Sequence, residues 1–233
     1  KEPDGSTYQS WMWKNCAGFQ TITYKGNGQA GRKVAHSLGR APEMMWVKAR
    51  KPSGAEVQDW VVYHKGLNGG SNPADWRIYL NSSNAQNNQG VSVWNSTMPD
   101  SRYFTLGTDA DTNDDAGNYY EYICYLFASV DGFSKCGYYT GDGSTDGSKE
   151  INLGFTPRFV ILKSVNNVTD WWVFDTLRGL PASGNASYLK INETNAEASA
   201  VASINATSTG FKLVQNYNSI NANGTKIIYY AHA

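Results

Sequence analysis

The sequence has few charged residues and no long hydrophobic run. Only 17% of its 233 residues are charged, and 20 basic side chains balance 20 acidic ones. A net charge of zero supplies no long-range attraction for phosphate backbones or anionic lipid, so we expect no nucleic-acid partner. The longest apolar run, residues 122–130, is far below the roughly 20 residues that cross a bilayer. We therefore expect no membrane insertion.

Cysteine is scarce, and the sequence lacks the motifs of common catalytic sites. Cys16, Cys124 and Cys136 are odd in number and have no CxxC spacing, which predicts three free thiols and no zinc site. No GxSxG, HExxH or P-loop sequence occurs. We therefore expect that the protein is not an enzyme and has no cofactor.

One acidic cluster offers a weaker site hypothesis. Asp109, Asp111 and Asn113 place oxygen atoms at alternate positions, as a calcium loop begins. The pattern then fails, because Asp114 stands where glycine is needed and Tyr120 where a bidentate Glu is needed. A solvated hairpin loop is the preferred interpretation, with Ca²⁺ as the alternative.

Glycine and aromatic residues are abundant, which is typical of strands and turns. The sequence holds 23 glycines, and 13% of its residues are aromatic. Short runs of Val, Ile, Tyr, Trp and Phe alternate with clusters of Gly, Asn, Asp and Ser, a spacing that predicts an all-β fold. The alanine-rich segment 195–203 has a polar counterpart at 84–89, so we expect both segments to be irregular.

The chain also repeats itself. Tyr24 and Tyr139 open similar Gly-rich turns 115 residues apart, and residues 44–48 match 159–163 at the same offset. Residues 59–63 match 170–174 at an offset of 111, and 104–106 match 211–213 at 107, with Gly117 answering Gly224. The offset shrinks in steps, as deletions in loops between shared strands would make it. These matches predict two tandem antiparallel β-sandwich domains, jelly-roll or lectin-like, related by internal duplication.

The repeat also predicts the domain boundaries. We expect copy one at residues 20–135, copy two at 136–233, and a terminal strand of a preceding copy or a linker at 1–19. Residues 11–14 resemble 123–127 and should form a strand equivalent to it, paired with copy one or with a neighbouring chain. Such phasing suggests an array that extends further upstream.

The aromatic residues are the candidate ligand-binding groups. Aromatic faces beside Asn and Asp are how neutral proteins bind sugars. Strand alternation places Trp60 in the core, and it sends either Trp171 or Trp172 to the surface. Asp59 and Asp170 are matched acids beside these tryptophans. Each copy supplies only one such acid, so a turn role is favoured over the paired carboxylates that glycoside hydrolysis requires.

Several of these stretches resemble a repeated domain in virion proteins of tailed phages. The resemblance is closest to tail-fibre-like and other virion surface proteins of marine and cyanobacterial phages. It covers nearly the whole chain from about residue 8 and rests on residues 19–31, 36–39, 42–44, 59–64, 79–81, 94–99 and 133–141. That family carries no agreed catalytic residues.

The resemblance implies a non-enzymatic protein on the surface of the phage particle. Its partners would be other virion proteins and a host cell-surface glycan, bound in host adhesion. A homo-oligomer is implied too, with a trimer favoured. The alternatives are a purely structural component, such as a fibre spacer or capsid decoration protein, and a polysaccharide-degrading tail enzyme.

Overall fold

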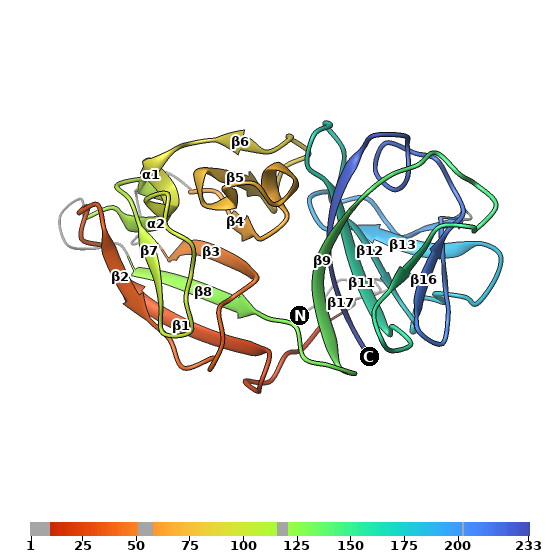
Figure 1. Ribbon diagram of the computed structural model, residues 1–233, viewed down its shortest axis with the longest axis horizontal. Coiled ribbons are helices and arrows are strands. Elements are labelled where there is room, and N and C mark those ends of the chain that lie inside the picture. Colours follow the sequence, from red (N-terminus) through yellow and green to blue (C-terminus); the bar gives the residue numbers. More distant parts are fainter. Residues whose placement is uncertain (1–9, 51–57, 116–120, 202) are drawn as a thin grey trace, which may run out of the picture.

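The protein is built mainly from antiparallel strands in two groups that lie side by side (Figure 1). This computed structural model describes residues 10–50, 58–115, 121–201 and 203–233. Strands β1 to β8 form the first group and β9 to β17 the second. The arrangement is consistent with two β-domains. Residues 1–9 of the expected terminal segment, and the match at Gly117, lie outside the described residues.

The first group contains a six-stranded sheet in the order β1-β8-β3-β4-β5-β6 and a separate β2-β7 pair. Four short helices are interspersed, namely η1 (Leu67–Gly70), η2 (Pro73–Asp75), α1 (Val91–Trp94) and α2 (Ala110–Asn113). The strands are β1 (Phe19–Lys25), β2 (Arg32–Ala35), β3 (Met44–Arg50), β4 (Val61–His64), β5 (Trp76–Tyr79), β6 (Asn87–Asn88), β7 (Tyr103–Leu106) and β8 (Glu121–Phe127).

The second group contains a six-stranded sheet in the order β14-β13-β12-β11-β17-β9 and a three-stranded sheet, β10-β16-β15. Its strands are β9 (Ser134–Thr140), β10 (Glu150–Asn152), β11 (Phe159–Ser164), β12 (Trp172–Asp175), β13 (Ala186–Lys190), β14 (Ala198–Val201), β15 (Ile204–Ala206), β16 (Gly210–Leu213) and β17 (Lys226–His232). In both six-stranded sheets the first strand of the group is at an edge, next to the last strand, and the third to sixth strands follow in order.

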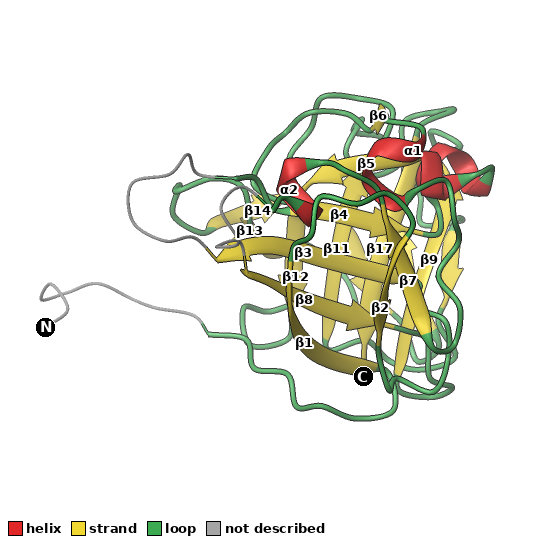
Figure 2. Ribbon diagram, turned by 90° about the vertical axis from the view of Figure 1, so that its left-hand side faces the viewer, coloured by secondary structure: helices red, strands yellow, loops and turns green. Residues whose placement is uncertain are grey.

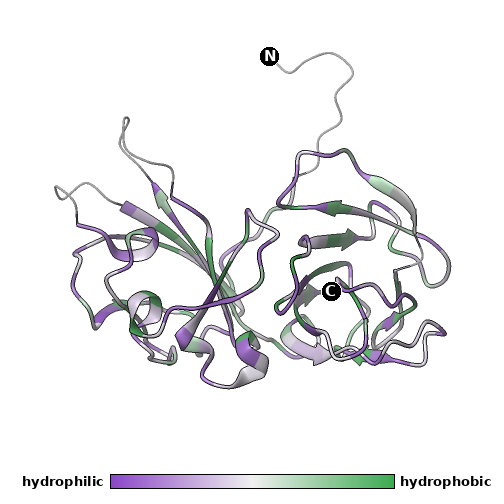
Figure 3. Cartoon of the chain, turned by 90° about the horizontal axis from the view of Figure 1, so that it is seen from above, coloured by the Kyte–Doolittle hydropathy of each residue, from purple (hydrophilic) through white to green (hydrophobic). Residues whose placement is uncertain are grey.

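Each six-stranded sheet is covered on both faces. One face packs against the small sheet of its own group, and the other packs against the facing six-stranded sheet, which creates a shared central core. Pleat alternation divides the side chains of β3 between two cores. Met45 and Val47 are buried in the core of the first group, on the side of the β2-β7 pair, whereas Met44 and Trp46 enter the central core. Figure 2 views the first group with β2 and β7 in front of the large sheet, and Figure 3 shows the hydrophobic strands along the boundary between the groups.

The expected N-terminal strand is absent, since residues 11–14 form no strand and pair with no other strand of the described residues. The position next to β1 is already taken by β8, which pairs with both β1 and β3. Trp11 and Trp13 pack instead against the central core. Just before β1, Cys16 forms an isolated antiparallel β-bridge with Phe19.

The expectation of irregular structure at 195–203 and 84–89 is also wrong in part. β14 pairs with β13, and β6 pairs with β5 through Trp76 and Arg77. These additions occur at the far edges of the two large sheets, where pairing uses main-chain groups and needs no apolar side chain.

Candidate functional site

A pocket of about 480 Å³ opens between the two groups. Its floor is the inner face of the first six-stranded sheet, where three neighbouring strands present aromatic side chains. The strand register places Thr21 of β1 opposite Tyr125 of β8, and Tyr125 opposite Trp46 of β3. Phe19 and Phe127 are likewise opposite each other, one step along the same face. The floor is therefore a direct product of antiparallel register and pleat alternation.

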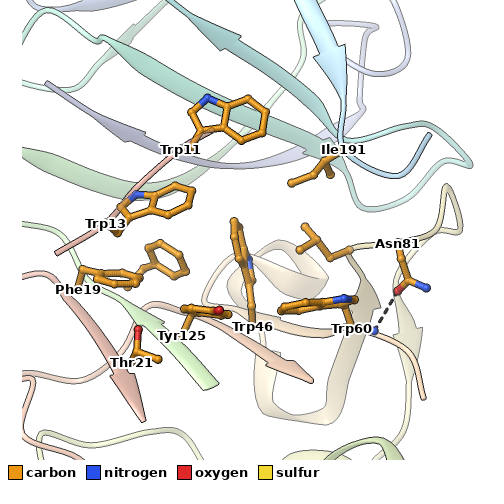
Figure 4. A pocket seen from close by; sticks show the side chains of 11 residues that line it. Trp11, Trp13, Phe19, Thr21, Trp46, Trp60, Asn81, Tyr125 and Ile191 are labelled. Atoms are coloured by element: carbon orange, nitrogen blue, oxygen red, sulfur yellow. Dashed lines mark hydrogen bonds between the residues drawn. The ribbon is translucent and has the colours of Figure 1, made fainter. Parts of the chain in front are cut away.

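Trp60 extends this floor from the residue just before β4. Its ring stacks with that of Tyr125, with 6.0 Å between centroids and 17° between planes (Figure 4). Trp60 is half-buried and not fully enclosed, contrary to the sequence-based expectation. Strand alternation assigned its face correctly, because Trp60 packs against the central core with Val62. The two rings form a platform in the floor of the pocket.

The N-terminal segment supplies the opposite wall through Trp11 and Trp13 (Figure 4). Trp13 makes edge contacts with Trp46, Phe127 and, from the second group, Phe159, at centroid separations of 6.2, 6.1 and 5.9 Å. The Trp11 indole N–H donates to a carboxylate oxygen of Asp175 at 3.2 Å. Side chains of both groups therefore hold this segment in place.

Polar groups in the pocket are few and neutral. The hydroxyls of Thr21 and Tyr125 and the indole N–H of Trp60 form no hydrogen bond within the described residues. Asn81, by contrast, accepts from the Trp60 main-chain N–H at 2.9 Å and donates to Asp59 at 2.8 Å. No charged side chain of the described residues lines the pocket. The arrangement offers ring faces, hydroxyls and an N–H group, and no acid or base.

Asp59 and Asp170 occupy matching structural positions. The Asn192 amide donates to Asp170 at 2.8 Å and accepts the Trp171 main-chain N–H at 2.8 Å, which repeats the contacts of Asn81 with Asp59 and Trp60. Burial raises the pKa of Asp170, but hydrogen bonds from Lys190 and Asn192 outweigh it and hold the pKa below its usual value. Each acid thus positions an asparagine that secures the start of a strand.

The expectation that Trp171 or Trp172 reaches the surface is wrong. Trp171 is 1% exposed and Trp172 is 8% exposed. Trp171 lies in the central core, while Trp172 faces the outer core of the second group and stacks on Tyr188 with 4.1 Å between centroids. The sequence argument assumed that one face of the sheet meets water, whereas both faces of this sheet are covered.

The acidic cluster is an ion-pair site and not a solvated loop. One guanidinium nitrogen of Arg77 lies 2.9 Å from Asp109 and 3.1 Å from Asp111, and all three side chains are at most 16% exposed. Asp109 also caps α2 by accepting the Asp111 N–H. Asn113 bonds main-chain groups, its amide donating to Gly107 O at 2.7 Å. No cluster of three His, Cys, Asp or Glu side chains suited to a metal occurs in the described ranges.

All three cysteines are free thiols, as the sequence predicts. Cys16 is exposed, whereas burial raises the pKa of Cys124 and Cys136 far above the usual value. Those two thiols therefore stay protonated and inert. Among the described residues, no helix is long and apolar enough to span a membrane.

Sequence reasoning missed most of the pocket. Of the candidate ligand-binding residues only Trp60 lines it. Asp59 does not line the pocket but accepts a hydrogen bond from the lining residue Asn81. A usable signal was present, since β1, β3 and β8 each carry aromatic residues at positions that share one face. The missed lining residues include Trp11, Trp13, Phe19, Trp46, Tyr125 and Phe127.

The fold and pocket define a mostly β protein of two packed antiparallel groups with an aromatic cavity between them. The chain belongs to the family described as a domain of unknown function (DUF7483), whose model matches residues 2–233. Searches of curated proteins and of solved structures found no match.

Proposed function

We propose that this protein is a non-enzymatic surface component of a tailed-phage virion, a tail fibre or similar appendage, which adheres to the host by binding a cell-surface glycan. The observation that carries the proposal is the aromatic pocket with its unengaged hydroxyl and indole N–H groups. A sugar ring presents C–H groups on its faces and hydroxyls on its rim. The ring faces of the Trp60–Tyr125 platform can stack on the C–H groups of the sugar. The polar groups of Thr21, Tyr125 and Trp60 can form hydrogen bonds with its hydroxyls.

We also infer that the two groups are duplicated lectin-like or jelly-roll β-sandwiches. The shared strand order and the repeated asparagine–aspartate pairs support this inference. After duplication, the surroundings of Trp60 and Trp171 became different. Trp171 became enclosed in the central core, while Trp60 remained at the pocket.

The adhesin is expected to act as a homo-oligomer, with a trimer favoured. Closed symmetry would present several copies of a weak sugar site to one cell and raise avidity by about 10² to 10⁴ without any new contact. A fibre spacer or capsid decoration protein is the structural alternative, and there the pocket would have no ligand. A polysaccharide-degrading enzyme would need two facing carboxylates. Among the described residues, no carboxylate lines the pocket.

A glycan array with the purified chain tests the proposal. We expect binding that is lost in Trp60→Ala and reduced in Tyr125→Phe, which removes only a hydroxyl. The matched control is Tyr103→Phe, since Tyr103 is exposed on β7 of the outer pair. Binding that is unaffected by Trp60→Ala, or no binding to any glycan, would contradict the proposal and favour the spacer role.

A further inference from the structure

Charged groups near the pocket lining are already engaged. Lys48, two residues after Trp46 on β3, donates to the main-chain oxygen of Gln58. Asp59 accepts from Asn81, and Asp175 accepts from Trp11 and pairs with Arg178 at 2.7 Å. Lys163 is fully buried and donates to the main-chain oxygens of Ser83 and Thr169 at 3.1 and 2.6 Å. None of these groups lines the pocket, and each is held by other partners, so none is placed to pair with a charge brought in by a ligand.

From this we infer, on the basis of the proposed function, that the pocket selects neutral glycans and rejects those that carry a carboxylate. A uronate entering the cavity would give up its water and meet ring faces and neutral donors only. Transfer of an ion to such a site is unfavourable without a partner of opposite charge. The negative π-faces of the rings add repulsion toward an anion, whereas they attract the C–H groups of a neutral sugar.

An amino sugar distinguishes two kinds of uncharged aromatic site, one that binds neutral sugars and one that binds an ammonium group. Ring faces attract cations, so an aromatic cage built for an ammonium group would bind glucosamine more tightly than glucose. The hydroxyls of Thr21 and Tyr125 can pair with a sugar hydroxyl or with an ammonium. An ammonium would also lose its hydration without meeting a negative charge, because no carboxylate of the described residues lines the pocket, so the neutral sugar is favoured.

The test is an array of glucose, galactose and mannose oligomers, each in neutral, uronate and amino forms. We expect neutral forms to bind at least roughly tenfold more tightly than either charged form, a factor equivalent to about 1.4 kcal/mol. Tighter binding of a uronate or of an amino form would overturn the inference. If that binding is also lost in Trp60→Ala, glycan adhesion stands and only the neutral selectivity fails. If no oligomer binds, both fail.

A single introduced charge provides a second measurement. Thr21→Lys places an ammonium group at the pocket edge and should bring the uronate form to equal or better affinity than the neutral one. Ile191→Lys, from the wall supplied by the second group, repeats the test if the first variant folds poorly. Thr108→Lys, exposed outside the pocket, is the matched control and should leave the selectivity unchanged. Unchanged selectivity in both pocket variants would contradict the inference.

Discussion

The indole N–H of Trp171 donates to the main-chain oxygen of Tyr79 at 2.8 Å, so a side chain of the second group is hydrogen bonded to a strand of the first. Trp171 is also almost completely enclosed. Trp60 occupies the matching place before β4 and lines the open pocket instead. The two groups thus contact each other asymmetrically, and the pocket lies on the side where the matching tryptophan is not enclosed.

Replacing Trp171 should destabilise the protein far more than replacing Trp60. We expect Trp171→Ala to lower the free energy of unfolding by about 3–5 kcal/mol, because it empties a large site in the central core. Trp171→Phe should cost about 1–3 kcal/mol through the unpaired Tyr79 oxygen. Urea denaturation measures both. Trp60→Ala is the matched control, and an equal loss there would contradict the asymmetric packing.

Acid should weaken the protein through His64. This ring is fully buried: Nε2 donates to Tyr229 O at 3.1 Å, and Nδ1 accepts the Gly66 N–H at 2.9 Å. Burial lowers the pKa of His64 to about 4, and the positive charge of Lys65 lowers it further, whereas the hydrogen bond to Tyr229 O and the negative charge of Glu43 act in the opposite direction. The unfolded chain, with the usual value of 6.5, therefore takes up the proton first.

The stability that His64 contributes is complete above about pH 6.5 and is lost as the pH falls toward 4, by about 3 kcal/mol. Urea denaturation across this pH range measures the loss. His64→Phe should lack that part of the pH dependence, while His36 and His232 titrate in both proteins. Parallel curves for the two proteins would show that His64 does not cause the loss.

Arg77 should be essential to the acidic cluster, and calcium should not. Removing the guanidinium leaves Asp109 and Asp111 close together and unpaired, so Arg77→Met should cost about 3–5 kcal/mol. Arg50→Met is the control, since the Arg50–Glu121 pair is exposed and should contribute at most about 1 kcal/mol. We expect millimolar Ca²⁺ to leave the melting temperature of the native protein unchanged. A clear rise would contradict the ion-pair assignment.

The two asparagines that secure strand starts should differ in importance. Asn192→Ala should cost about 1–3 kcal/mol, because it leaves the Trp171 N–H at the central core without its acceptor. Asn81→Ala should cost less, roughly 0.5–1 kcal/mol, since Asn81 is exposed and water can replace it. Thermal denaturation of the pair measures the difference, and a reversed order would be inconsistent with the burial of the two sites.

The sequence was informative where local chemistry decides the outcome. Val, Ile and aromatic runs between turn residues predicted the strands. Trp60 and Trp171, which the sequence comparison paired, each directly precede the fourth strand of their group. Alternation failed at Trp171 and Trp172, since it reports which residues share a face and not what covers that face. The Arg77 ion pairs and the wall formed by Trp13 join residues far apart in the chain, and no local pattern marks them.

The central core has a consequence for how the protein unfolds. Because Met44, Trp46, Phe159 and Ile161 share one apolar interior, neither group can open without exposing the inner face of the other. Separating the groups would expose a large apolar sheet surface of each to water, so a folded half beside an unfolded half is a high-energy state. The chain should therefore melt in one cooperative calorimetric transition, in which the calorimetric and van't Hoff enthalpies agree for all 233 residues.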